Sequence, residues 1–472
     1  MAATSEPTRP VADFDSAART HMLISLAFLA MAAVLGLLAA LKLAYPSFVA
    51  ATPFLAYGRL WPMAVNTLVF GFLTFSNIAA AYFLIPRLMG APLRGERLAR
   101  LAAGPGAVIT ALAIVLVGAG LTPNQGRVLG EFHVGFDLAL ILFYLIPLIV
   151  CLRTVADRTV ESIFISVWYI LGGLFWLIGL MVVGLNPWVG GVGSALLGSF
   201  YGAGLIGLWS VGVGIGAAYY VVVRTTDNPL FSRSLALAGF WSLAFAQVWT
   251  GPASMIFGAA AEWIETIAVV FTLGMIIPAL AVLANFIGTI QGKWALVRER
   301  SDLRFAIVSA VVAVFLALVS SAQGFRSVAA VTGQTSFGPA TQTGLLLGVA
   351  SLYAAAFLYY ALPQAFGRTL FSESLGRRQL QLTLWGVGGL ILSMWVGGLA
   401  AGYTWLSGVY TGAFASVGEG FVNTLNATGP FRISAFVFSL VVAAAQLTFL
   451  VNMYRTVTSG AAAPQEILVA AQ

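Results

Sequence analysis

Long apolar stretches recur along the whole chain, and they constrain its fold more than any other feature. Each reaches or approaches the ~20 residues that an α-helix needs to cross a hydrocarbon core about 30 Å thick. Unbroken apolar runs dominate over alternating ten-residue strands, so we predict an all-α, polytopic bundle of twelve transmembrane helices. The predicted spans are 22–44, 62–85, 101–121, 134–152, 162–184, 195–223, 235–257, 266–290, 304–322, 340–362, 380–403 and 431–454.

The composition excludes the soluble classes of protein. Of the 472 residues, 60% are hydrophobic and only 8% are charged, whereas a soluble domain carries about 25% charged residues. The mean hydropathy is +0.96. So few charges cannot cover a water-facing surface of this size. A soluble enzyme, a nucleic-acid-binding domain and a disordered chain are therefore excluded, and the lipid bilayer is the expected surrounding.

The distribution of basic residues predicts the orientation. Of the 23 Lys and Arg residues, 18 lie in the amino-terminal segment, the even-numbered loops and the carboxyl-terminal tail. Lys42 lies within the first span, and four residues lie in the odd-numbered loops: Arg59, Arg127, Arg326 and Arg432. Cytoplasmic loops of membrane proteins are enriched in Lys and Arg. We therefore predict a protein of a bacterial-type inner membrane with both termini in the cytoplasm. The same distribution explains the net charge of +7 without a nucleic-acid partner.

The same pattern predicts the domain organisation. Residues 1–21 form a cytoplasmic segment, 22–454 the membrane domain and 455–472 a cytoplasmic tail. No linker, charge block or short repeat divides the membrane domain. The loop 404–430 is rich in aromatic and small residues, and we expect it to lie along the membrane face.

A few ionisable residues lie near the predicted outer side, and they are candidates for a proton or ion path. Asp137 follows His133 by four residues, so one helical face carries both, and Glu131 is close in sequence. These residues form either a proton or cation entry point or a satisfied interfacial cluster. The cluster is the simpler interpretation, because charge costs little near the water boundary. Glu265, at the start of the eighth span, has the same two interpretations.

Several stretches resemble one family in the same order along the chain. They are GRLWPMAVNTLVFGF (58–72), GRVLGEFHVGFDLALILFYL (126–145), VESIFISVWYILGGLFWL (160–177), SFYGAGLIG (199–207), FWSLAFAQVWTGPASM (240–255), WIETIAVVFTLGMIIPALAVLANFIGTIQGKW (263–294) and ILSMWVGGLAAG (391–402). Together they resemble subunit I of the haem-copper oxidases, in the cbb(3)-type cytochrome c oxidase branch. The resemblance implies a twelve-helix respiratory subunit with two haems, one copper and cytochrome c-type partner subunits.

The six metal-ligand histidines that the resemblance implies are missing from this chain, which has only His21 and His133. The corresponding positions hold other residues. They are Ala64 for a low-spin haem ligand, Ala203, Ala253 and Ser254 for copper ligands, Gln247 for the active-site tyrosine, and Ala340 and Gln342, or the residues one position earlier, for the tenth-span haem ligands.

This donor set predicts that the chain binds no haem and no copper. A low-spin haem needs two axial donors such as His or Met, and copper needs soft or imidazole donors. Met63 and His133 are the only weak candidates for unusual haem ligands. We do not expect this chain alone to reduce oxygen. The leading hypothesis is a metal-depleted paralogue, a pseudo-enzyme, that acts as a structural or proton-conducting subunit.

Two alternatives remain open. One is a haem-containing oxidoreductase that uses unusual ligands, and the other is a membrane carrier that uses the emptied cavity for a small solute. We also expect the cofactor space to be closed by helix approach at Gly202, Gly204 and Gly251, or filled by lipid or water, because an empty cavity costs ~24 cal/mol per Å³.

Overall fold

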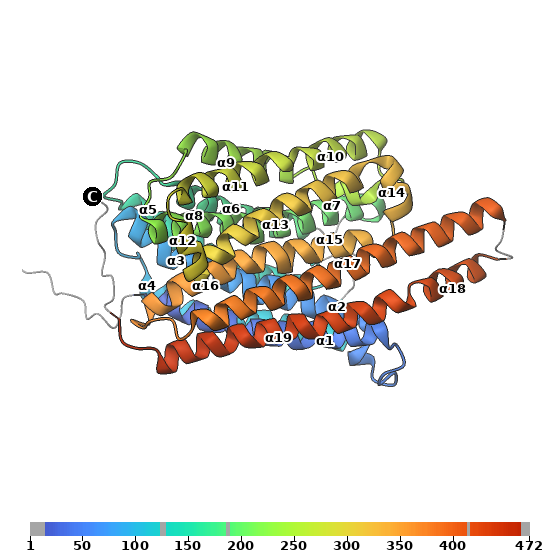
Figure 1. Ribbon diagram of the computed structural model, residues 1–472, viewed down its shortest axis with the longest axis horizontal. Coiled ribbons are helices and arrows are strands. Elements are labelled where there is room, and N and C mark those ends of the chain that lie inside the picture. Colours follow the sequence, from blue (N-terminus) through green and yellow to red (C-terminus); the bar gives the residue numbers. More distant parts are fainter. Residues whose placement is uncertain (1–14, 123–128, 186–188, 413–415, 464–472) are drawn as a thin grey trace, which may run out of the picture.

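The computed structural model describes residues 15–122, 129–185, 189–412 and 416–463, and all the extended regular elements in these residues are helices. The helices run along the long axis of one bundle (Figure 1). The all-α polytopic fold is confirmed. The elements are α1 (Ser16–Ala44), η2 (Pro53–Leu55), α2 (Tyr57–Asn66), η3 (Thr67–Leu73), α3 (Thr74–Met89), α4 (Glu96–Ala119), α5 (Val134–Ala156), α6 (Ile165–Gly184), α7 (Gly191–Gly204), η4 (Leu205–Val211), α8 (Gly212–Thr226), α9 (Arg233–Gln247), η5 (Gly251–Met255), α10 (Glu262–Gly274), α11 (Ile276–Ile290), α12 (Trp294–Glu299), α13 (Ser301–Gly324), α14 (Arg326–Thr332), α15 (Phe337–Thr343), η6 (Gly344–Ala350), α16 (Ser351–Ala365), α17 (Glu373–Thr411), α18 (Val417–Ala427) and α19 (Gly429–Ser459).

Eleven helices in the described residues, some of them composite, are long and apolar enough to cross a membrane. The predicted seventh span, 235–257, is the exception, so the prediction of a continuous helix there is wrong. Its α-helix, α9, has 15 residues and ends at Gln247, and the five-residue 3₁₀-helix η5 follows. Gly251 and Pro252 begin η5, and Pro is favoured at the first positions of a helix because it has no N–H group to leave unpaired.

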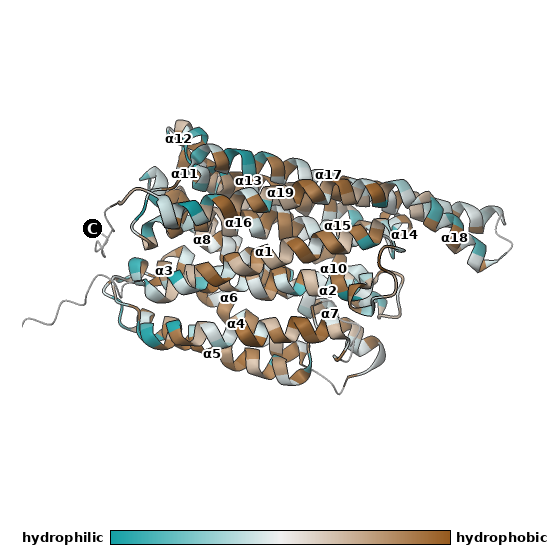
Figure 2. Cartoon of the chain, turned by 90° about the horizontal axis from the view of Figure 1, so that it is seen from below, coloured by the Kyte–Doolittle hydropathy of each residue, from teal (hydrophilic) through white to brown (hydrophobic). Residues whose placement is uncertain are grey.

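Three composite helices form the centre of the bundle. They are α2–η3–α3, α7–η4–α8 and α15–η6–α16, whose most apolar windows are 100%, 89% and 89% buried. The corresponding windows of the other spans are 28–44% buried. Hydrophobic residues dominate the middle of the bundle, and hydrophilic residues are more frequent towards its ends (Figure 2). This distribution matches a membrane protein whose lipid-facing surface is apolar.

Each central helix contains a seven-residue π-helical turn: η3, η4 and η6. A hydroxyl group donates to the carbonyl five residues earlier in each case: Thr74 to Val69, Ser210 to Leu205 and Ser351 to Leu346, all at 2.8 Å. The π turn shifts the hydrogen-bond register, and the hydroxyl satisfies a carbonyl within it. The turns pack together, since η4 contacts both η3 and η6.

A second arrangement occurs in two helical hairpins. In each, an asparagine of the later helix binds the backbone of the serine at the start of the earlier helix. Asn285 accepts from the backbone N–H of Ser232 (3.0 Å) and donates to its carbonyl (2.8 Å). In the later hairpin, Asn452 donates to the Ser372 carbonyl (2.9 Å). Both serines cap their helices and follow Leu-Phe, at 230–232 and 370–372. The two Leu-Phe-Ser segments are a short repeated motif within the membrane domain, and they do not divide it.

The start of α1 is fixed by buried charge. Arg87 and Asp15 form an ion pair at 2.7 Å with both side chains 7% exposed, and Glu96 accepts from the Ser16 hydroxyl and the Ala17 N–H. The helix therefore begins six residues before the predicted boundary at residue 22. At the other end of the chain, α19 continues to Ser459, beyond the predicted boundary at 454. The segments 1–14 and 464–472 lie outside the described residues.

The prediction that 404–430 lies along the membrane face is wrong. Helix α17 runs on to Thr411, and α18 packs against it. The two form a helical hairpin that extends past the other helices along the long axis of the bundle (Figure 1). The segment therefore continues the spanning helix α17 and returns through α18 to α19.

The orientation can be tested with reporter fusions. We expect a reporter that is active only in the periplasm to be inactive when fused after Gln472 and active when inserted after Gly412. The reason is the 18-to-4 distribution of basic residues between the two sides. The reverse result would contradict the predicted topology.

The paired amide in the first hairpin should contribute to stability. Replacing Asn285 with Ala leaves the Ser232 N–H and carbonyl without their partner, and we expect a loss of about 1–3 kcal/mol. The measurement is the unfolding midpoint in mixed detergent micelles. The control is Asn423→Ala on the exposed face of α18. Equal losses in the two variants would contradict a specific role for Asn285.

Candidate functional site

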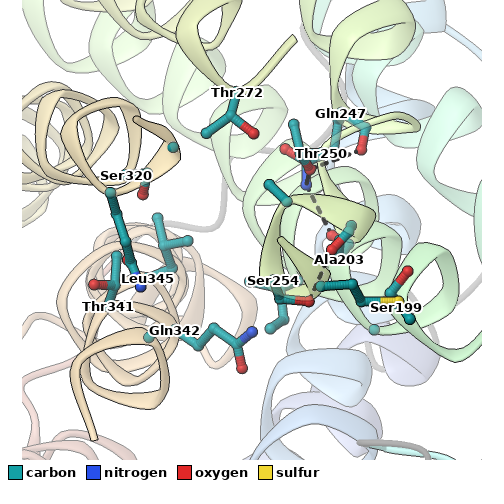
Figure 3. A pocket seen from close by; sticks show the side chains of 18 of the residues that line it. Ser199, Ala203, Gln247, Thr250, Ser254, Thr272, Ser320, Thr341, Gln342 and Leu345 are labelled. Atoms are coloured by element: carbon teal, nitrogen blue, oxygen red, sulfur yellow. Dashed lines mark hydrogen bonds between the residues drawn. The ribbon is translucent and has the colours of Figure 1, made fainter. Parts of the chain in front are cut away.

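A polar cavity of about 340 Å³ lies between α7, η5, α10, α13 and α15. Hydroxyl and amide side chains from all these elements face it (Figure 3). The polar lining residues are Ser199, Gln247, Thr250, Ser254, Thr272, Ser320, Gln323, Thr341 and Gln342, and Met255 adds one sulfur. We call this space the polar cavity. It lies towards the predicted outer end of the bundle, where α13 ends and α15 begins.

The residues at the implied copper positions line the polar cavity together. Ala203 comes from α7, and Ala253 and Ser254 come from η5. Gln247, at the implied tyrosine position, donates to the Ala203 carbonyl (2.9 Å) and the Thr250 hydroxyl (3.1 Å). The sequence therefore brings these four positions together, although none of them carries an imidazole or a phenol.

An apolar cavity of about 210 Å³ lies beside the polar one, between α1, α2, α15, α17 and α19. Ala64, at an implied haem-ligand position, lines it together with aliphatic residues and the rings of Tyr57 and Trp61. Ile206 and Gln342 line both cavities. These two side chains thus mark the boundary between a polar and an apolar space.

The implied tenth-span positions distribute between the two cavities. Ala340 is fully buried and packs with Val387 and Ile391, so it lines neither. One position earlier in each case, Pro339 lines the apolar cavity and Thr341 the polar one. Whichever register applies, the side chains facing the cavities are those of proline, threonine and glutamine.

Helix approach narrows this region without closing it. Gly204 packs against the Leu180 side chain, and Gly251 lies against the backbone of Ser199 and Phe200. A side chain at either glycine would collide with these neighbours. The two cavities nevertheless remain, so helix approach alone does not close the space. The alternative, that lipid or water fills it, stays a prediction.

The two weak candidates for unusual haem ligands lie away from both cavities. His133 is exposed at the start of α5, where its Nδ1 accepts from the Gly135 N–H at 3.2 Å. Met63 is buried, and its sulfur lies over Gly118 of α4. His21 is fully buried between the rings of Phe75 and Tyr82 in α3. Each therefore has a capping or packing role.

Glu131 lies in the segment between α4 and α5 and is fixed by a buried amide. Asn66 of α2 donates to its carboxylate at 2.8 Å, and burial raises the pKa of Glu131 above its usual value. Asp137 lies in the first turn of α5 and Glu265, which is buried, in the first turn of α10. Neither lines a cavity described above, so the structure shows no chain of acids linking them. No group of three or more His, Cys, Asp or Glu residues that could hold a metal occurs in the described part of the chain.

Most of the polar residues that line the cavity could not be predicted from the sequence. Thr250, Thr272, Ser320 and Thr341 are single hydroxyl residues in apolar helices. Such residues commonly donate to their own helix and leave no distinctive pattern. The sequence could have indicated them only by their nearness to helix ends that flank the implied ligand positions. The fold is needed to bring these positions together.

The fold and the paired cavities define a helical, polytopic membrane protein with internal cavities. The chain belongs to the family cytochrome c and quinol oxidase polypeptide I, which it matches over residues 16–441. The expected resemblance to haem-copper oxidase subunit I is thus confirmed. The chain is a multi-pass membrane protein of the bacterial type.

Its relatives include subunits of cbb(3)-type oxidases. The chain is 25% identical to the cbb3-type cytochrome c oxidase subunit CcoN1 of Stutzerimonas stutzeri, covering 93% of both chains. It is 24% identical to a cytochrome c oxidase subunit 1 homolog of Azorhizobium caulinodans, covering 90% of this chain and 79% of the relative. A bacteroid homolog from Bradyrhizobium diazoefficiens is also 24% identical, with coverage of 92% and 80%.

Glu131 should make stability depend on pH. Because its pKa is raised in the folded state, the folded chain binds the proton more tightly than the unfolded chain. Its contribution to stability is therefore full in acid and is lost as the pH rises through the folded-state pKa. We expect Glu131→Gln to raise the melting temperature at neutral pH and to flatten its pH dependence above about 4.3. Melting in detergent measures this, with exposed Glu262→Gln as the control. A lower melting temperature for Glu131→Gln at neutral pH would contradict the argument.

Proposed function

We propose that this protein is a metal-depleted member of the oxidase subunit I family and acts as a structural subunit of a bacterial respiratory membrane complex. One observation carries the proposal: the residues at the implied copper positions face one cavity together, and they are Ala203, Ala253 and Ser254. Alanine offers no donor, and serine is a poor donor to copper. Two haems and a copper therefore do not fit this donor set.

A structural role is favoured over proton conduction. A proton path through a membrane needs a succession of titratable groups. Asp137 and Glu265 lie in first helical turns and Glu131 in the segment before α5, all near the predicted outer side. The described lining of both cavities consists of neutral side chains. The interpretation of these acids as interfacial groups follows from this arrangement.

A surface for a partner supports the assignment as a subunit. The α17–α18 hairpin exposes apolar side chains beyond the bundle, among them Tyr410 (84% exposed) and Val417 (77% exposed). Large exposed apolar surfaces mark interaction sites. The relative named CcoN1 is itself a subunit by its printed name. We propose that another membrane subunit of the same complex covers this hairpin.

The test is the metal content of the purified chain. We expect fewer than about 0.1 iron or copper atoms per chain and no haem bands in a reduced-minus-oxidised spectrum. The triple variant Ala203→His, Ala253→His and Ser254→His should gain about one copper per chain, because three imidazoles then face one cavity. Exposed Asn423→His serves as the control that gains none.

The opposite outcome is equally clear. About one haem per chain in the unaltered protein, lost on changing His133 to Ala, would overturn the proposal and establish the alternative of a haem protein with unusual ligands. Stoichiometric copper in the unaltered protein would overturn it as well.

A further inference from the structure

We infer that the polar cavity is a binding site for a small uncharged solute that donates N–H or O–H hydrogen bonds. The inference rests on the proposed function, because it needs a cavity free of metal. It goes beyond that function by giving the cavity a ligand of defined chemistry.

Five of the six hydroxyl groups in the lining have already committed their hydrogen atoms. Each donates to a carbonyl three or four residues earlier in the same helical segment, at 2.7–3.2 Å. They are Ser199, Thr250, Ser254, Thr272 and Thr341. A hydroxyl oxygen has two lone pairs besides its one hydrogen. These residues therefore offer lone pairs, and few hydrogens, to anything in the cavity.

Gln247 adds a further acceptor. Its amide nitrogen donates both of its hydrogens, one to the Ala203 carbonyl and one to the Thr250 hydroxyl. The carbonyl oxygen of the side chain is left to accept. The indole N–H of Trp395 donates to the Thr341 hydroxyl. The hydroxyl oxygens of Thr250 and Thr341 each keep one further lone pair. These side chains thus offer acceptors to the cavity, while the Ser320 hydroxyl and the amides of Gln323 and Gln342 are the lining groups that can also donate.

Gln342 supplies the main group that can adapt to a ligand. No hydrogen bond joins its side chain to the described part of the protein, and the side chain is exposed although the flanking Thr341 and Thr343 are buried. Its amide points into the cavity (Figure 3). Because Gln342 also borders the apolar cavity, it can bind the polar end of a solute and separate it from the apolar space.

Charge and size then define the ligand. Asp, Glu, Lys, Arg and His are missing from the described residues that line the cavity, so a bound ion would have no opposite charge beside it. A purely apolar solute would leave the acceptors unmatched. The volume of about 340 Å³ leaves room for a small organic solute.

The experiment compares two probes that differ in donors. Acetamide carries two N–H groups, and N,N-dimethylacetamide carries none. Binding to the full chain in lipid nanodiscs is measured by saturation transfer to the methyl protons of each probe. We expect acetamide to bind and dimethylacetamide to bind at least about tenfold more weakly. Methylammonium tests the charge argument, and it should bind no better than dimethylacetamide.

Variants of the cavity locate the binding. The double change Ser254→Ala and Thr272→Val removes two acceptors and should weaken acetamide binding about tenfold. The matched control is Thr110→Val, which loses the same kind of buried hydroxyl bond in α4. Ala203→Met fills the cavity without removing any hydroxyl, so it tests the site even where the double variant does not fold.

Each outcome decides the inference. Equal binding of the two amides, preferred binding of methylammonium, or acetamide binding that survives both cavity variants would overturn it. The metal content of the same samples separates the two levels of the argument. A metal-free protein that does not bind acetamide overturns this inference alone, whereas stoichiometric copper overturns the proposed function.

Discussion

The three central helices must satisfy their own backbone polar groups, and the rest of the structure depends on how they do so. Inside a membrane protein there is no bulk water to pair an exposed carbonyl. The π turns η3, η4 and η6 shift the hydrogen-bond register in the most buried helices, and a hydroxyl at Thr74, Ser210 or Ser351 donates back into each turn. The Trp209 indole joins two of these helices by donating to Thr74 at 2.9 Å. These hydrogen bonds help to fix the shape of the bundle centre.

The ends of the helices are fixed by the same economy of polar contacts. Each of the two repeated hairpins uses an asparagine to bind the backbone of the serine that caps the preceding helix, at Asn285 with Ser232 and at Asn452 with Ser372. The threonine four residues later, Thr289 or Thr456, accepts from the N–H of the preceding phenylalanine. The two hairpins therefore share the amide bond to the serine carbonyl and the threonine bond to the phenylalanine N–H, and only Asn285 also accepts from the serine N–H.

The sequence predicted what depends on hydrophobicity and failed where single polar residues decide. Span lengths follow from apolar runs, so the helical fold and nearly all the spans could be predicted. The break after Gln247 was missed because the apolar run 235–257 continues through it. The repeat was missed because Leu-Phe-Ser is only three residues long, and its meaning lies in a partner 53 or 80 residues away. The resemblance identified Ala203 and Ala253 as site positions, but the hydroxyls around them needed the fold.

The two open cavities indicate that the space between the helices has a use. If the cofactor space had no use, larger side chains at Ala203 and Ala253 would fill it and gain stability, since filling a cavity recovers about 24 cal/mol per Å³. Instead, small residues line a polar space next to Gln247, whose side chain would collide with any residue larger than glycine at position 207. Its amide hydrogens satisfy the Ala203 carbonyl and the Thr250 hydroxyl, which orients its oxygen as an acceptor. Three neighbours thus hold the buried amide while the surrounding volume stays open, and this arrangement preserves the cavity. Binding of a solute requires such a cavity, whereas the proposed loss of the cofactors alone does not explain it.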